Sequence, residues 1–467
     1  MVSSKKGTKI DQVIHLIMSR IKTNEILPGG KLPSLRKLAQ ELNMSVSTVL
    51  EAYERLIVDR KIEVRRGAGY YVKDKPYIPN IDSSKKSKNT ESDPFWVAHQ
   101  SLVSGDNYLK PGCGWLPIDW MPEQIIKKSL RDILQKSPET ILSYSSILGY
   151  EPLRQLIAER INYHGSSIQH DQILLTDSST QALDMICRTL LKPGDTILVD
   201  DPCYFNFFTL AQLLQVEVIA IPFTPHGPDP ESFALALKKS PKIYITNSGV
   251  HNPTGASLNI STAYKILKMA EEANMIIIED DVYADFEVIP APRYASLSNF
   301  EHVIQVSSFS KSLSASFRCG YIAAKQEYID VLTKIKIATN FNSNQLNAVL
   351  IYQCLKDVQY RRYLEYRNTR LSSARAHVIH KLMHLGIEPW TLPNAGMFIW
   401  CKLPSNIEAS ALTKLCSDDQ VILAPGDIFS RSKTAEHFIR FNVAQCLNDK
   451  VFKVLEKNIT GKHSYDI

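Results

Sequence analysis

The chain has 467 residues, 44% of them hydrophobic, and a formal net charge of +6, and its length is enough for two or three domains with complete cores. No apolar run approaches the roughly 20 residues that span a bilayer, and no signal peptide is found, so we expect a cytoplasmic protein without a membrane partner. The eight cysteines form no Cys-x-x-Cys pair and no metal-binding spacing, which argues against a zinc site and for reduced thiols.

The start of the chain contains three segments in which apolar residues recur at helical spacing, at 10–21, 35–42 and 46–57. Ser34 and Ser45 directly precede the second and third segments, where their side chains would cap the helix N-termini. Two short helices joined by a tight turn, the second opened by small hydroxyl residues, are typical of a helix-turn-helix.

Basic charge is concentrated at this end of the chain. Residues 61–72 alternate around glycines, which predicts a β-hairpin wing after the helices. Residues 1–88 hold 18 Lys and Arg against 9 Asp and Glu, a net of +9, whereas residues 89–467 hold 36 against 39, a net of −3. Such a distribution predicts binding to DNA phosphates, and the alternative is a small interaction module with a solvated basic face. We therefore expect a DNA-binding domain over 1–75 and a polar linker over 76–94.

Further along the chain, candidate site residues follow predicted parallel strands. A strand, a polar turn and a helix succeed one another around Ser179 and Thr180, whose hydroxyls and backbone N–H groups would form an anion site. The apolar run 275–278 ends in acids and predicts another buried parallel strand. A carboxylate just past such a strand lies where α/β folds bind ligands, and either Asp280 or Asp281 fits that position.

The segment 306–321 combines one lysine with a cluster of hydroxyls and a later arginine. A lysine that forms a Schiff base needs a partly desolvated amine and an anion held nearby. Ser308, Ser310 and Arg318 would hold a phosphate dianion beside Lys311 through hydroxyl donors and a guanidinium fork. The alternative is a solvated serine-rich loop with an ordinary lysine.

These segments, in this order, resemble those of the fold-type I pyridoxal-phosphate enzymes of the aspartate aminotransferase superfamily, over roughly residues 95–460. The resemblance implies that Lys311 forms the covalent aldimine bond to pyridoxal 5'-phosphate. The residues on the cofactor phosphate would then be Ser179, Thr180, Ser308 and Arg318.

The same resemblance implies a role for the residues around the cofactor ring. Asn252, in the turn His-Asn-Pro-Thr-Gly, would bond the phenolic oxygen, which Tyr283 would also touch. Asp280 would keep the ring nitrogen protonated, and Tyr204 would stack on the ring. The neighbouring acid, Asp281, is the rival of Asp280 for the ring nitrogen.

Two further residues take their expected roles from this family. Tyr144 matches a tyrosine that crosses a dimer interface to the phosphate of the neighbouring subunit. Arg440 lies in a segment that resembles the strand whose arginine clamps the carboxylate of an amino acid, a task that suits its bidentate geometry.

The fold that the resemblance implies is multidomain. An N-terminal winged helix-turn-helix would precede an α/β PLP-dependent transferase-like domain of fold type I over 95–467. Its large subdomain would span about 140–350, and a smaller α/β C-terminal subdomain would combine about 95–135 with 351–467.

The segment 32–56 resembles the GntR-type winged helix. That resemblance implies that Arg36 contacts a phosphate or a base edge and that Ser47 and Thr48 open the recognition helix. Arg66 and Gly67 would form the tip of the wing.

A winged helix fused to an aminotransferase-like body resembles the MocR/GabR class of bacterial regulators across essentially the whole chain. The resemblance implies a head-to-tail homodimer that binds operator DNA and senses an amino acid, an amine or a B6 vitamin through a Schiff base at Lys311. The rival function is an active aminotransferase that carries a DNA-binding domain. A third alternative, a scaffold that has lost its cofactor, is disfavoured by the intact residues Asn252, Asp280, Lys311 and Arg318.

Overall fold

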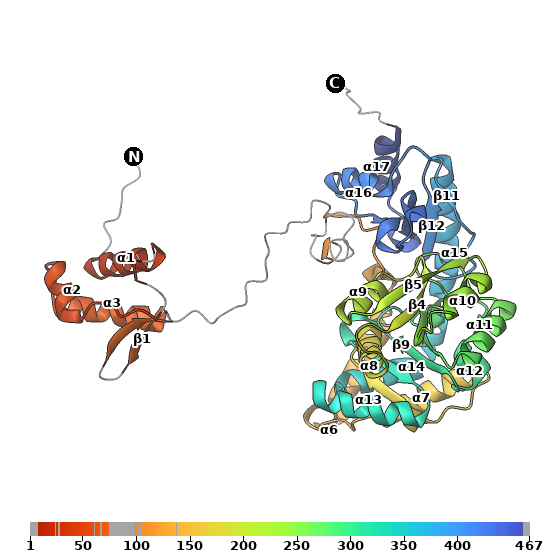
Figure 1. The fold of residues 1–467 in the computed structure, drawn as a ribbon, viewed down its shortest axis with the longest axis horizontal. Helices are drawn as coiled ribbons and strands as arrows, with labels where there is room; N and C mark the ends of the chain where they lie inside the picture. The colour runs from red at the N-terminus through yellow and green to blue at the C-terminus, as the bar shows by residue number, and fades with distance from the viewer. Residues whose placement is uncertain are drawn as a thin grey trace. The chain divides into compact units, whose positions relative to one another are not determined.

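The computed structural model of the chain describes two compact units, within Met1–Ser87 and Lys88–Ile467. Each unit folds around cores of its own (Figure 1). The structure describes residues 8–23, 25–26, 29–59, 61–65, 68–73, 99–100, 102, 105, 107–136 and 138–460.

The N-terminal unit consists of three helices and a hairpin, namely α1 (Lys9–Lys22), α2 (Leu35–Glu41), α3 (Val46–Val58), β1 (Ile62–Arg65) and β2 (Gly69–Val72). The two strands pair antiparallel, with Ile62 opposite Val72. Helices and hairpin share one core, which includes Val13, Ile17, Leu38, Val49, Tyr53, Leu56, Ile62 and Val72. The predicted helix-turn-helix with a β-hairpin wing is confirmed.

Serine side chains start both helices of the helix-turn-helix. The Ser34 hydroxyl accepts a hydrogen bond from the Lys37 backbone N–H at 3.3 Å, and the Ser45 hydroxyl accepts one from the Thr48 N–H at 3.2 Å. Each bond satisfies a backbone donor that the helix leaves without a partner, so both predicted N-caps are confirmed. Asn43, in the turn between α2 and α3, has a left-handed φ of 51°, which asparagine adopts more readily than most residues.

An eight-stranded sheet forms the centre of the C-terminal unit. In spatial order it contains β3 (Ile173–Thr176), β10 (Gly320–Ala323), β9 (Val303–Ser308), β8 (Ile276–Asp280), β7 (Ile243–Thr246), β4 (Thr196–Asp201), β5 (Glu217–Thr224) and β6 (Gly227–Pro228). The strands from β9 to β5 run parallel, whereas β10 is antiparallel to both of its neighbours. Nearly every residue of β7, β8 and β9 is buried, as expected for strands covered on both faces.

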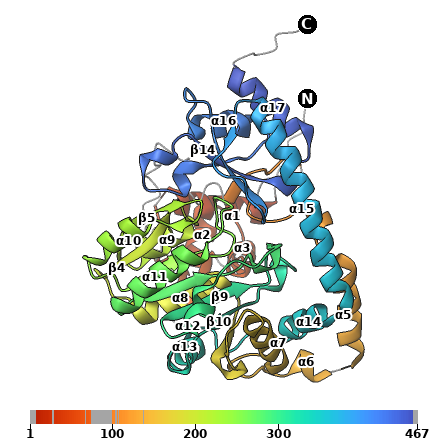
Figure 2. The ribbon, with the colours of Figure 1, turned by 90° about the vertical axis from the view of Figure 1, so that its right-hand side faces the viewer.

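Helices cover both faces of this sheet (Figure 2). One layer contains α8 (Ser179–Leu190), α9 (Asn206–Leu213) and α13 (Gln326–Thr339). The other contains α5 (Glu123–Lys136), α7 (Glu151–Asn162), α10 (Pro230–Leu237), α11 (Ile260–Glu272), α12 (Tyr294–Ser298) and α14 (Gln345–Lys356), and the short α6 (Pro138–Leu142) lies near α14. Successive side chains of a strand point to opposite faces of the sheet. Leu198 therefore packs with the layer that contains α5 and α7, and Val199 packs with the layer that contains α8 and α9.

The C-terminal part of this unit has a second sheet with its own core. Its strands, in the order β11 (Glu388–Pro389), β12 (Phe398–Lys402), β14 (Phe438–Asn442) and β13 (Ala424–Pro425), pair antiparallel. The helices that pack on it are α15 (Val358–His384), α16 (Ala409–Asp418) and α17 (Asp449–Thr460). Short 3-10 helices are η1 (Ile118–Trp120), η2 (His170–Gln172), η3 (Ala284–Phe286), η4 (Ala315–Phe317), η5 (Gly426–Ile428), η6 (Lys433–Ala435) and η7 (Val443–Gln445).

Residues 107–116, which we call the entry segment, are attached to this second sheet by main-chain hydrogen bonds. The Leu109 N–H donates to the Gln420 carbonyl at 2.9 Å, and the Ile422 N–H donates back to the Leu109 carbonyl at 2.9 Å. The Gly112 N–H donates to the Ile422 carbonyl at 2.9 Å. The entry segment is therefore held like an additional short strand, although it lies some 300 residues before its partners along the chain.

None of the described helices has both the length and the apolar content that crossing a bilayer demands. All eight cysteines lie in the described part of the C-terminal unit, and each is buried and unbridged.

The Ser45 cap yields a first prediction. Substitution Ser45→Ala should destabilise α3 by about 1 kcal/mol, because the Thr48 N–H loses its acceptor at the helix N-terminus. Hydrogen-exchange mass spectrometry on the whole chain should show faster exchange in peptides that cover α3. Ser47→Ala is the matched control, since the Ser47 hydroxyl bonds only the Ser45 hydroxyl, at 2.9 Å. Unchanged exchange in Ser45→Ala would contradict the capping role.

Candidate functional site

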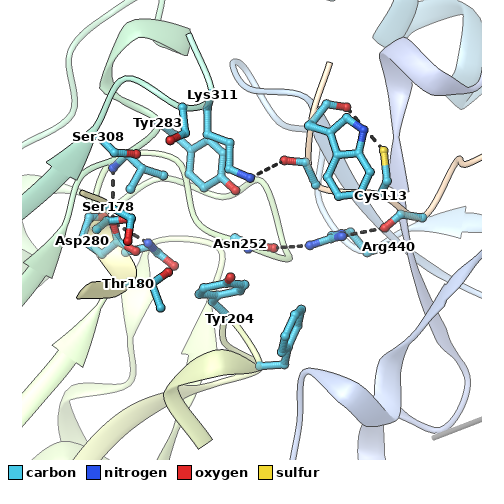
Figure 3. A pocket seen from close by; sticks show the side chains of 18 of the residues that line it. Cys113, Ser178, Thr180, Tyr204, Asn252, Asp280, Tyr283, Ser308, Lys311 and Arg440 are labelled. Atoms are coloured by element: carbon cyan, nitrogen blue, oxygen red, sulfur yellow. Dashed lines mark hydrogen bonds between the residues drawn. The ribbon is translucent and has the colours of Figure 1, made fainter. Parts of the chain in front are cut away.

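A cavity of about 230 Å³ lies in the C-terminal unit, at the carboxyl ends of the parallel strands (Figure 3). Its wall combines residues that directly follow β8 and β9 with the N-terminus of α8 and with Arg440 from the second sheet. Strand ends of an α/β sheet are the usual place for a ligand, because loops and helix N-termini meet there.

The structure gathers nearly all the body residues singled out in the sequence at this one cavity. They are Ser179, Thr180, Tyr204, Asn252, Asp280, Tyr283, Ser308, Lys311, Arg318 and Arg440, with Ser310 beside them. Tyr144 lies elsewhere: it is 82% exposed, and its ring packs edge-on against Phe341 with centroids 5.7 Å apart. Its reach to a neighbouring subunit stays a prediction.

One end of the cavity is rich in hydrogen-bond donors for an anion. The Ser178 hydroxyl caps α8 by accepting from the Gln181 N–H at 3.0 Å, so Ser179 and Thr180 form the first turn with their backbone donors free of helical partners. Ser308 ends β9 on the same side (Figure 3). Helix dipole and hydroxyls together favour negative charge at this end.

Arg318 and Ser310 complete that end. Arg318 is exposed and has a left-handed backbone with φ 43°, which turns the chain at the edge of the cavity. The Ser310 hydroxyl is buried and has no hydrogen-bond partner among the described residues. A buried hydroxyl without a partner is costly, so a ligand acceptor at this place would stabilise the site.

Asp280 is the acid that faces the cavity, at the end of β8 (Figure 3). Burial raises the pKa of its carboxyl to about 7, while hydrogen bonding from Asn247 and from the Val282 N–H opposes that rise. Asp281 instead forms a buried ion pair with Arg293 at 2.9 Å. The geometry thus separates two acids that the sequence left as rivals.

Lys311 lies opposite Asn252 across the middle of the cavity (Figure 3). Its Nζ donates to the Gly114 carbonyl of the entry segment at 2.7 Å. Burial, and secondly the charge of Arg440, lower the pKa of Lys311 to about 8. A much larger fraction of its amine than in an ordinary lysine is therefore neutral and nucleophilic near neutral pH, although most of it stays protonated.

Arg440 is buried at the other end of the cavity, only 4% exposed. Its Nη1 donates to the Asn252 side-chain oxygen at 2.8 Å and its Nη2 to the Gly112 carbonyl at 2.6 Å. The guanidinium contacts the rings of Phe398 and Phe429, at 4.4 and 4.6 Å from their centroids. Among the described residues no carboxylate pairs with it, and its Nε has no acceptor. A buried cation in this state favours an anionic ligand.

The entry segment is the main part of the site that the sequence did not reveal. Gly112, Cys113, Gly114 and Trp115 line the cavity, and the carbonyls of the two glycines accept from Arg440 and Lys311. A side chain at Gly112 would bring its Cβ to 2.4 Å from the Ala424 backbone nitrogen, so only glycine fits there. The signal in the sequence was the Gly-Cys-Gly run after a proline, directly beyond the polar linker. Asn247, Phe205 and Ile428 also line the cavity without having been predicted.

The residues predicted to contact DNA lie at the surface of the N-terminal unit. Arg36 is exposed on α2, Ser47 is exposed on the first turn of α3, and Thr48 beside it is partly buried. Arg66 and Gly67, the predicted wing tip, lie outside the described residues.

Two protein-family models match the chain. Residues 116–457 match the model for aminotransferase class I and II, and residues 9–72 match that for bacterial regulatory proteins of the gntR family. A similar curated protein is the uncharacterized HTH-type transcriptional regulator YdfD of Bacillus subtilis, 26% identical over 94% of this chain and 93% of that protein. The HTH-type transcriptional regulator NorG of Staphylococcus aureus is 25% identical over 92% of this chain and 99% of its own length.

Solved structures with the same fold as the C-terminal unit are aminotransferases. LysN, an α-aminoadipate aminotransferase of Thermus thermophilus, superposes with a TM-score of 0.71 at 24% identity, over 78% of this chain and 94% of that one. The kynurenine aminotransferase of Pyrococcus horikoshii gives the same TM-score, identity and coverage. At this identity the likeness concerns the fold alone.

Proposed function

The chain belongs to the aminotransferase class I and II family, and on that premise we propose that it is a transcriptional regulator that binds DNA and senses an amine or amino acid through pyridoxal phosphate. The observation that carries the proposal is a gntR-type helix-turn-helix in the same chain as a complete lysine pocket. Regulators named as HTH-type match this chain over nearly the whole of both lengths, which supports the same function.

The cavity fits pyridoxal phosphate from end to end. The N-terminus of α8, Ser308, the unpartnered hydroxyl of Ser310 and Arg318 would hold the phosphate. When bound, this cofactor supplies an aldehyde that bonds covalently to primary amines and a ring that withdraws electrons.

The chain's own residues would tune that chemistry. Asp280 would hold a proton at the ring nitrogen, and the positive ring would in turn draw the pKa of this carboxyl below the value that burial gives it. Tyr204 would stack on the ring, and Asn252 and Tyr283 would hydrogen-bond its phenolic oxygen. Lys311 would offer the neutral amine.

The N-terminal unit would supply the DNA contacts. The first turn of α3 carries Ser47 and Thr48 at its surface, as a helix that enters the major groove by its N-terminus requires. Arg36 projects from α2 for a phosphate or a base edge.

A ligand can change DNA affinity only if it favours one arrangement of the protein over another. The entry segment lies near the start of the C-terminal unit, and its carbonyls accept hydrogen bonds from both Lys311 and Arg440. A ligand that bonds to these two groups would therefore compete with the entry segment for them. The path of the chain between the linker and the C-terminal unit would then change. A homodimer is the second route, since Tyr144 and Phe341 are large exposed side chains that a second copy of the chain would cover.

An active aminotransferase with a DNA-binding unit remains the second candidate function. It is favoured by the buried Arg440, whose unpartnered Nε suits a carboxylate, and by the complete set around Lys311. This alternative would be selected if the chain converts an amino acid to its keto acid faster than the same amino acid changes the binding to DNA.

The cofactor site gives a second prediction. Cofactor-free protein, mixed with pyridoxal phosphate and then reduced with borohydride, should carry the pyridoxyl group on Lys311. The labelling rate should rise through pH about 8, because only the neutral amine reacts and burial favours that form. An ordinary lysine would show this rise near pH 10.4.

Lys336 is the matched control for this labelling. Burial lowers its pKa to about 8 as well, but its Nζ donates to the Ile147 carbonyl and the Ser343 hydroxyl, outside the cavity. Lys311→Arg should abolish labelling, whereas Lys336→Arg should retain it. A pyridoxyl group on any other lysine would contradict the assignment.

The DNA-binding unit gives a third prediction. Binding to operator fragments selected from random sequence should weaken steeply as salt rises, because residues 1–88 carry a net charge of +9. Arg36→Ala should weaken binding by about 1–3 kcal/mol and relax one base position if it contacts a base, or lower the salt slope by about one if it contacts a phosphate. Arg55→Ala removes the same charge from the last turn of α3, where Arg55 pairs with Glu51 at 2.8 Å, and should change binding less. Retention of the operator by a chain without residues 1–75 would refute the assignment.

A further inference from the structure

The charges of the cavity divide between its two ends. Its charged lining residues are Asp280, Lys311, Arg318 and Arg440. Under the proposed function the first three serve the ring, the amine and the phosphate of the cofactor. Among the described residues that line the cavity, Arg440 is thus the one charged group left for the rest of a ligand. Figure 3 shows it beyond Asn252, on the side away from Ser178 and Thr180.

Arg440 can pair with one carboxylate. Its two Nη atoms already donate to neutral oxygens of Asn252 and Gly112, and the Nε remains without an acceptor. Its guanidinium also contacts the rings of Phe398 and Phe429, 4.4 and 4.6 Å from their centroids, and these contacts restrict its movement. A restrained and buried guanidinium that lacks an anion is completed by a single planar carboxylate.

Apart from Lys311, the lining residues near Arg440 are uncharged, and they include the neutral polar side chains of Tyr204, Asn252 and Tyr283. Cys113 is 2% exposed, and burial raises the pKa of its thiol, so this side chain stays neutral. Trp115, Phe205 and Ile428 complete the wall, and the Phe205 ring lies 6.2 Å from that of Phe429, which itself contacts Arg440. These side chains offer no second cation for another carboxylate and no acid for a second ammonium group.

Gly114 brings the two ends of a ligand close together. A Cβ at this position would lie 3.7 Å from the Lys311 Nζ and 3.9 Å from the Arg440 Nη2. Because both nitrogens approach one point, the amine of a ligand at Lys311 and its carboxylate at Arg440 are near each other, as they are when one carbon carries both. The missing side chain at Gly114 also leaves room between them.

From these observations, and resting on the proposed function, we infer that the effector is an α-amino acid with one carboxylate and an uncharged side chain. A dicarboxylic or a basic amino acid would bring a second charge against Cys113, Trp115, Phe205 and Ile428, where nothing in the described wall pairs with it. An unpaired buried charge weakens binding strongly, and we expect at least a tenfold loss, on the order of 1.4 kcal/mol.

The test compares the binding of four primary amines to the cofactor-loaded full chain. Binding is measured through the visible absorption of the bound cofactor. L-leucine should bind at least about tenfold tighter than L-glutamate, L-lysine or 3-methylbutylamine, the last of which has the side chain of leucine without its carboxylate. Equal or tighter binding of glutamate or lysine would overturn the inference, as would the absence of any spectral response to leucine.

Variants separate the two parts of the inference. Arg440→Gln should remove most of the preference for leucine over 3-methylbutylamine. Its affinities are measured against its own cofactor spectrum without ligand, because Arg440 bonds Asn252 and lowers the pKa of Lys311. Gly114→Ala places a methyl group between Lys311 and Arg440 and should weaken leucine binding more than glycine binding. Gly105→Ala is its control, because a Cβ there would meet nothing within 4 Å, and it should leave both affinities unchanged. An undiminished preference for leucine over 3-methylbutylamine in Arg440→Gln would contradict the carboxylate site.

The same samples distinguish a failure of this inference from a failure of the proposed function. Absorption of the lysine-bound cofactor and operator binding are recorded before any amine is added. Their absence would refute the proposed function, and the effector class with it. Their presence together with a preference for glutamate or lysine would refute the effector class alone.

Discussion

Two cations, Lys311 and Arg440, line one cavity without a carboxylate bonded to either among the described residues. Bringing such groups out of water is costly, and the protein offsets this cost with main-chain carbonyls rather than with acids. Burial lowers the pKa of Lys311 and raises that of Asp280. Because burial disfavours the ionised form of Asp280, its carboxyl compensates little of the positive charge in the cavity. The proposed ligands would bring the missing negative charge, a phosphate at the N-terminus of α8 and a carboxylate at Arg440.

The main-chain carbonyls that accept hydrogen bonds from Lys311 and Arg440 belong to the entry segment. This segment joins the second sheet through Leu109 and Gly112 and continues, along the chain, from the linker that follows the N-terminal unit. The groups that would meet the cofactor and the effector therefore also hold the beginning of the C-terminal unit. Under the proposed function, a ligand that bonds to Lys311 and Arg440 would compete with their hydrogen bonds to the entry segment.

Much of the fold and of the candidate site was predictable from the sequence, because residues within short sequence motifs carry the chemistry. Lys311 with its serines, Asn252 in its turn and the helix caps at Ser34 and Ser45 could be found from local patterns. Three features could not. The family resemblance favoured Asp280, but the exclusion of its rival Asp281 could not be predicted, because it depends on the ion pair of Asp281 with Arg293. The entry segment acts through backbone carbonyls, which every residue has, so its Gly-Cys-Gly run does not by itself indicate a contact with Lys311 or Arg440. Tyr144 is exposed in the single chain, and its expected contact with a second copy stays a prediction.

The central claim, that the lysine pocket and the DNA-binding unit form one linked system, is tested most directly by thermodynamic linkage. L-leucine is titrated into the cofactor-loaded chain with and without saturating operator DNA, and the cofactor absorption reports binding. The account predicts that operator shifts the affinity for leucine by the same factor by which leucine shifts the affinity for operator. Superimposable titration curves would contradict it, because the two units would then be merely joined by the linker.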